Sequence, residues 1–172
     1  MGEAFSEELG NGMSPVDAFR EVFDEEVNVT WGLEGAGLGC KMITGGACVT
    51  SSKQINFLSM STPGGWRNFT MALRSARNHV VHEFGHAFAS RYGDSPEGPY
   101  RNIPSILIKS PRGFASSPMS ANLTWRQNPE KSASEVFADM FLGWVFDMWA
   151  ADSFGDMRDD FMTERMPNWL IY

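Results

Sequence analysis

The chain has 172 residues, of which 42% are hydrophobic and 13% aromatic, and a formal net charge of −7. A chain of this length suits a single domain over residues 1–172, with enough apolar side chains for a buried core. The negative charge argues against nucleic acid as a partner, because binding phosphates requires a basic surface. No apolar run reaches the length of a membrane span, and MGEAFSEELG at the start lacks the basic and apolar regions of a signal peptide.

The first predicted element is a helix in SPVDAFREVFDEEV, residues 14–27. Ser14 is a suitable N-cap and Pro15 suits the first helical position. The charge of Asp17 is favourable near the positive end of the helix dipole. An apolar stripe at helical spacing would face the core, formed by Phe19, Val22 and Phe23.

Residues 27–60 have the composition of a small β-sheet. Short segments rich in β-branched and aromatic residues alternate with glycines, which predicts three or four strands. The segments are residues 27–32, 37–43, 46–51 and 53–60. Cys40 and Cys48, the only cysteines, flank a glycine-rich part of this region. Their spacing fits either a disulfide or two reduced thiols.

Residues 69–92 predict one long helix, because the period of the apolar residues changes to 3.6 there. Asn68 is a suitable N-cap, and Gly93 is a natural stop at the C-terminal end. The apolar stripe is formed by Phe69, Leu73, Ala76, Val80, Phe84 and Phe88.

The second half of the chain combines a long connection with further helices. Residues 93–128 are rich in Pro, Gly, Ser and Asn, and we expect a connection without clear structure. Residues 128–150 predict a helix with Asn128 as N-cap and Pro129 at its first position. Its core stripe would be Phe137, Met140, Phe141, Trp144 and Met148. A shorter acidic helix is expected near residues 154–166.

This order of elements is typical of an α+β fold. Residues 1–92, approximately, would form the small mixed sheet and the first long helix. Residues 93–172 would form the connection and a mainly helical C-terminal part.

All three histidines of the chain, His79, His82 and His86, lie in the predicted helix at 69–92. His82 begins the motif H-E-x-x-H as HEFGH, and a helix is the context that this motif requires. Positions i and i+4 lie about 40° apart around a helix, so His82 and His86 direct two imidazoles to one point. Glu83 lies about 100° from His82, close enough to reach a water at that point without being a ligand. Gly85 is costly inside a helix and indicates close packing by a neighbour.

A catalytic zinc normally has three protein ligands and one position for water, so a third ligand is required. The extended pattern H-E-x-x-H-x-x-G-x-x-H is absent, because Ala89 and Tyr92 stand where its glycine and histidine would be. ASEVFADMF in the next predicted long helix places Glu135 and Asp139 on one face, beside the apolar stripe. Glu135 can be the third ligand, and Asp139 can accept the ring N–H of a ligating histidine. Both acids are also compatible with an ordinary helix surface.

HEFGH followed by EVFAD resembles the gluzincin zinc metallopeptidases, and most of all the catalytic domains of the anthrax lethal factor and Pro-Pro endopeptidase group. The likeness covers residues 54–150, approximately. It implies a zincin-like fold, one Zn²⁺ per chain held by His82, His86 and Glu135, and a peptide or protein substrate. Enzymes of that group carry a tyrosine shortly before the third ligand, thought to hold the oxyanion. The corresponding segment TWRQNPEKSAS has none. Arg126 or the more distant Tyr100 could take that role, or the role is missing in this chain.

The expected reaction is hydrolysis of a peptide bond. Zinc lowers the pKa of a bound water to about 7 and polarises the scissile carbonyl. Glu83 would act as general base and later protonate the leaving amine. The resemblance also implies that an extended peptide adds to an edge strand, here residues 47–51.

Three alternatives stay open. A peptide deformylase also uses H-E-x-x-H, with a cysteine as third ligand, and Cys40 or Cys48 could serve. A zincin scaffold could bind a partner without cleaving it, although the intact Glu83 argues for catalysis. A purely structural zinc site would need a fourth protein ligand, which the sequence does not indicate. His79, one turn before His82, fits either the lining of the cleft or an ordinary helix surface.

Overall fold

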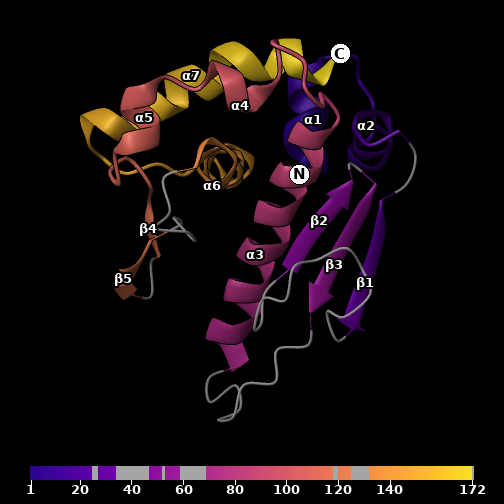
Figure 1. Ribbon diagram of the computed structural model, residues 1–172, viewed down its shortest axis with the longest axis horizontal. Coiled ribbons are helices and arrows are strands. Elements are labelled where there is room, and N and C mark those ends of the chain that lie inside the picture. The colour runs from indigo at the N-terminus through magenta and orange to yellow at the C-terminus, as the bar shows by residue number, and fades with distance from the viewer. Residues whose placement is uncertain are drawn as a thin grey trace.

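The computed structural model describes residues 1–24, 27–33, 47–51, 53–58, 69–117, 120–124 and 132–171. The described residues form a mixed α+β fold in which helices predominate, as expected. Figure 1 shows a small sheet beside the long helix α3, with α6 seen nearly end-on where it passes α3. None of the helices in these ranges combines the length and the apolar content that crossing a membrane requires.

Two short helices open the chain. The first, α1 (Gly2–Leu9), was not predicted from the sequence, and its Phe5 is fully buried. The helix predicted from Ser14 is α2 (Pro15–Val22), and the Ser14 hydroxyl accepts the Asp17 N–H at 3.2 Å, as a cap should. The helix is shorter than predicted, because the chain leaves the helical conformation at Asp24, which has a φ of 52°.

The sheet has three described strands, β1 (Asn28–Leu33), β2 (Ala47–Ser51) and β3 (Gln54–Leu58). The strand order is β1-β3-β2, with β1 parallel and β2 antiparallel to β3, so the expected mixed sheet is found. The strand predicted at residues 37–43 lies outside the described residues.

The long helix α3 (Phe69–Ser90) carries HEFGH and contacts both β2 and β3. It ends two residues earlier than predicted, and Gly93 adopts a left-handed conformation with a φ of 50° just beyond the end. The helix therefore has the sheet on one side and α6 on another.

The next long helix, α6 (Ala133–Phe146), differs from its prediction at both ends. Its N-cap is Ser132, whose hydroxyl accepts the Glu135 N–H at 3.3 Å; the predicted cap, Asn128, lies outside the described residues. The helix ends before Asp147, which is left-handed with a φ of 47°. Met148 therefore lies beyond the helix and is 37% exposed. The prediction that Met148 belongs to the core stripe was wrong.

The expectation of a connection without regular structure at 93–128 was wrong. This region contains two short helices and a two-stranded ribbon: α4 (Pro99–Asn102), α5 (Ser105–Lys109), β4 (Ser116–Ser117) and β5 (Ser120–Thr124). The apolar run IPSILIK supplies α5, and its Leu107 is buried. The last helix, α7 (Ser153–Leu170), is longer at its C-terminal end than predicted.

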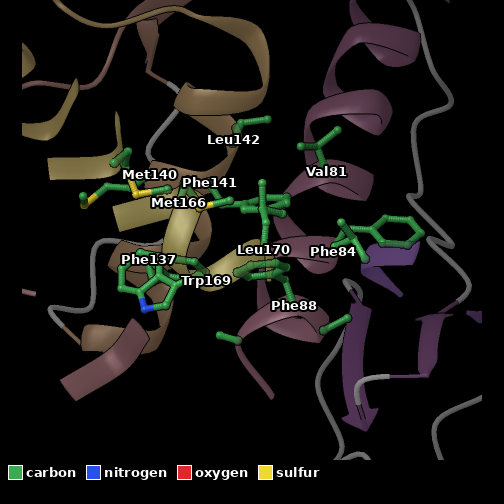
Figure 2. Packing of buried hydrophobic residues seen from close by; sticks show 14 of the residues in the cluster. Val81, Phe84, Phe88, Phe137, Met140, Phe141, Leu142, Met166, Trp169 and Leu170 are labelled. Atoms are coloured by element: carbon green, nitrogen blue, oxygen red, sulfur yellow. The ribbon is translucent and has the colours of Figure 1, made fainter. Parts of the chain in front are cut away.

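The core that positions α3 against α6 is aromatic. The rings of Phe88 and Phe141 stack with centroids 5.5 Å apart, and Phe137 packs edge-to-face on Trp169 of α7. Figure 2 shows these side chains meeting between α3, α6 and α7. At Gly85 the helices come so close that a Cβ atom would lie 2.9 Å from the Cα of Ala138. Gly85 thus permits the close approach that its place in a helix indicated.

Candidate metal centre

Two imidazoles of α3 meet on the side of the helix that faces the start of α6. His82 is 3% exposed, and its ring lies 4.9 Å from that of His86, measured between centroids. The two rings are nearly perpendicular, at 83°. Helical spacing alone therefore brings the two side chains together, as i and i+4 positions require.

Glu135 in the first turn of α6 completes the cluster. Its carboxylate oxygens lie 3.2 Å from Nε2 of His82 and 3.5 Å from Nε2 of His86. In a tetrahedral zinc site with ligands at about 2.0–2.1 Å, neighbouring ligand atoms are roughly 3.4 Å apart. One nitrogen from each histidine and one carboxylate oxygen lie within 4.8 Å of one another. The donor types and their separations therefore fit Zn²⁺ with three protein ligands.

Asp139 contacts His82 from the opposite edge of the imidazole. Its Oδ1 lies 2.8 Å from Nδ1 of His82, and the carboxylate is 1% exposed. With the Nδ1 proton donated to Asp139, the lone pair of Nε2 is available on the side where Glu135 lies. The contact fits the supporting role that the sequence indicated for Asp139, and the role itself stays a prediction.

The charges around His82 stabilise its protonated form in the metal-free protein. Burial disfavours the charged imidazole. Hydrogen bonds with Asp139 and Glu135, together with the charges of Asp139 and Glu83, outweigh burial and raise the pKa of His82 to about 9. Hydrogen bonds from His82 and His86 conversely hold the pKa of Glu135 well below its usual range. We therefore expect binding of a metal ion at neutral pH to release a proton from His82.

Glu83 lies beside the cluster and is not part of it. The residue is 5% exposed, and its Oε1 is 3.7 Å from Nε2 of His79, one helical turn earlier. Because Glu83 directly follows His82, we expect this buried carboxylate to reach a water bound to a metal at the cluster. The role of general base stays a prediction.

Tyr100 in α4 approaches the cluster from a different part of the chain. Its hydroxyl donates to the carbonyl of His86 at 3.4 Å, and its ring packs edge-to-face on Phe137. Burial, with the negative charges of Glu135 and Glu83, raises the pKa of the Tyr100 phenol above its usual value. The other residue considered for the oxyanion, Arg126, lies outside the described residues.

Of the two cysteines considered from the sequence, the structure describes the position of one. Cys48 lies in β2, and Cys40 is outside the described ranges, so the pairing of the two thiols stays open.

Ser132 was not singled out from the sequence, although it fixes the first turn of α6 and with it the backbone of Glu135. The capping pattern S-x-x-E at Ser132 and Glu135 could have revealed this start.

Comparison with known proteins adds no family assignment: no protein-family model matches the chain, and neither does a curated protein or a solved structure.

Proposed function

We propose that the protein is a zinc-dependent endopeptidase with a zincin-like fold, in which His82, His86 and Glu135 hold one Zn²⁺. The convergence of these three side chains from two helices carries the proposal. The buried contact of Asp139 with His82 supports it, because ligating histidines usually donate their other ring N–H to a carboxylate.

In the proposed hydrolysis, the zinc ion and Glu83 have separate roles. Zinc, when bound, would supply a Lewis acid that polarises the scissile carbonyl and lowers the pKa of a water. Glu83 takes the proton of the attacking water and passes it to the leaving amine. Its burial strengthens its electrostatic interactions with the reacting atoms, because they are poorly screened there.

Tyr100 is our candidate for stabilising the oxyanion that forms as the water attacks. A tyrosine hydroxyl is protonated at neutral pH, and the raised pKa of Tyr100 keeps it in that form, so that it can donate a hydrogen bond. The present hydrogen bond to the His86 carbonyl is long at 3.4 Å, so releasing it costs little. Tyr100 comes from α4 rather than from the segment before α6, where the resembling enzymes carry their tyrosine.

The peptide substrate is proposed to add to the sheet at β2. This strand contacts α3 and is the strand nearest to α3 in Figure 1. Among the described residues β2 pairs only with β3, at an end of the strand order. Addition of a strand satisfies the backbone groups of an extended peptide whatever its side chains are.

A peptide library incubated with the zinc-loaded protein tests this function, and Glu83→Gln with the same zinc content is the matched control. Glutamine has nearly the same shape as Glu83 but cannot accept the proton. We expect cleavage by the wild type and a loss on the order of 10²–10⁴-fold in the variant. Equal cleavage by both proteins at equal zinc content would refute the mechanism. Binding of peptides by the wild type without any cleavage would instead favour a regulatory role for the scaffold.

A further inference from the structure

His79 stands next to the proposed general base without belonging to the zinc cluster. It precedes Glu83 by four residues on α3, so the two side chains share one face of the helix. Nε2 of His79 lies 3.7 Å from Oε1 of Glu83, and this nitrogen atom is shielded from solvent although the side chain is 28% exposed. Bulk water therefore has little access to this contact.

A glutamate needs such a neighbour if it is to act as a base at a fixed place. Its side chain has several rotatable bonds, and ordering them costs free energy. A general base must lie within hydrogen-bond reach of the proton that it removes. Small displacements of catalytic groups strongly lower the reaction rate. A donor on one carboxylate oxygen restricts the rotation of the group and leaves the other oxygen to accept the proton.

We propose that His79 is a positioning residue for Glu83: the imidazole holds Oε1 of the carboxylate through Nε2–H, so that the second oxygen faces the attacking water. The proposal rests on the proposed function. The separation of 3.7 Å is longer than a hydrogen bond. Catalytic hydrogen bonds are often long in ligand-free sites and tighten only when substrate is bound.

Two substitutions of His79 separate positioning from a merely structural role. Leucine removes the donor, whereas the amide of glutamine can reach a carboxylate one turn away; both residues are compatible with a helix. We expect His79→Leu to lower kcat by roughly 10- to 100-fold with little change in KM. His79→Gln should recover part of the loss, and zinc content should stay at one per chain in both variants.

Arg77→Gln is the matched control on α3. The Arg77 side chain is exposed, and its guanidinium lies over the ring of Phe146 at the far end of α6. This control should leave kcat and KM unchanged. A change in KM alone for His79→Leu would mean that His79 contacts substrate. Equal loss of kcat in the leucine and glutamine variants, or loss of zinc, would also overturn the proposal.

A measurement without substrate tests the pairing independently of activity. The chain has three histidines, so long-range ¹H–¹⁵N NMR of the zinc-loaded protein can resolve all six ring nitrogens. We expect Nε2 of His79 to carry a proton and its resonance to shift in Glu83→Gln. An unchanged His79 spectrum would refute the pairing. If the zinc-loaded wild type cleaves no peptide, the proposed function fails, and the spectrum still decides whether His79 holds Glu83.

Discussion

The carboxylate of Asp139 lies 2.8 Å from Nδ1 of His82, while Glu135 approaches Nε2 of the same ring to within 3.2 Å. One buried imidazole is thus held between two acids four residues apart on α6. Glu135 also approaches Nε2 of His86, so the Nε2 edge of His82 is the one on which a metal would lie in the proposed site. This arrangement supports the proposal that Glu135 is a ligand and that Asp139 orients His82.

The first prediction follows from this division of roles. Asp139→Ala should weaken zinc binding by roughly 10- to 100-fold, the usual effect of removing an acid behind a ligating histidine. Glu135→Ala removes a ligand and should weaken it more. Titration with a competing chelator compares the two variants, and Asp139→Asn serves as control because its amide oxygen can still accept the His82 N–H. A larger loss for Asp139→Ala than for Glu135→Ala would reverse the assignment.

The second prediction concerns the stability of the metal-free protein against pH. The pKa of His82 is raised from 6.5 to about 9, so its protonated form is favoured by folding. This contribution is fully present below pH 6.5 and is lost as the pH rises through about 9. When a chelator is present, the denaturant concentration at the midpoint of unfolding should therefore decrease as the pH is raised from 6.5 to about 9.

His82→Gln provides the control for this pH dependence. The variant lacks the ionisable ring, so the part of the decline due to His82 should disappear from its profile. A wild-type midpoint that rises over this interval, or an unaltered profile in the variant, would contradict a pKa of about 9 for His82.

The third prediction tests the close approach of α3 and α6. A Cβ atom at Gly85 would lie 2.9 Å from the Cα of Ala138 and 3.1 Å from the Cβ of Phe141, so Gly85→Ala must push the helices apart. The cost should be about 1–3 kcal/mol, despite the better helix propensity of alanine. Because Glu135 is on α6, zinc affinity should fall together with the midpoint of unfolding. Unchanged stability and zinc affinity in the Gly85→Ala variant would show that this contact does not set the site.

The fourth prediction concerns Tyr100. Tyr100→Phe keeps the ring on Phe137 but removes the hydroxyl, and loss of one oxyanion donor typically lowers kcat by about 10²–10³-fold. Zinc content and the midpoint of unfolding should change little, because the hydrogen bond of the hydroxyl to a described residue, the His86 carbonyl, is a long one. Steady-state kinetics with matched zinc content measures the effect. Full activity of the phenylalanine variant would exclude Tyr100 from this role.

The sequence was most informative where local spacing decides geometry. Residues i and i+4 on a helix must share a face, so the meeting of His82 with His86 could be predicted without tertiary structure. That Glu135 and Asp139 point toward the interior could be predicted as well, because both border an apolar stripe that has to be buried. The structure brings these side chains together as expected, while zinc binding itself stays a prediction.

The features that were missed depend on contacts between distant segments. α1 is eight residues long, too short to be stable alone, and it is held by the packing of its Phe5 on the rings of Phe19 and Phe141. The approach of Tyr100 to His86 likewise depends on the path of residues 93–117, which local propensity does not determine. Polar composition made that region resemble an irregular connection, although tertiary contacts of Tyr100 and Leu107 order its short helices.

Anomalous diffraction from crystals of the zinc-loaded protein, recorded at the zinc absorption edge, tests the central claim most directly. We predict one zinc peak per chain at about 2.0–2.2 Å from Nε2 of His82, Nε2 of His86 and a carboxylate oxygen of Glu135. Asp139 should remain on Nδ1 of His82 in the same crystals. A zinc ion ligated by Cys40 or Cys48, or one that lacks Glu135 as a ligand, would contradict the account.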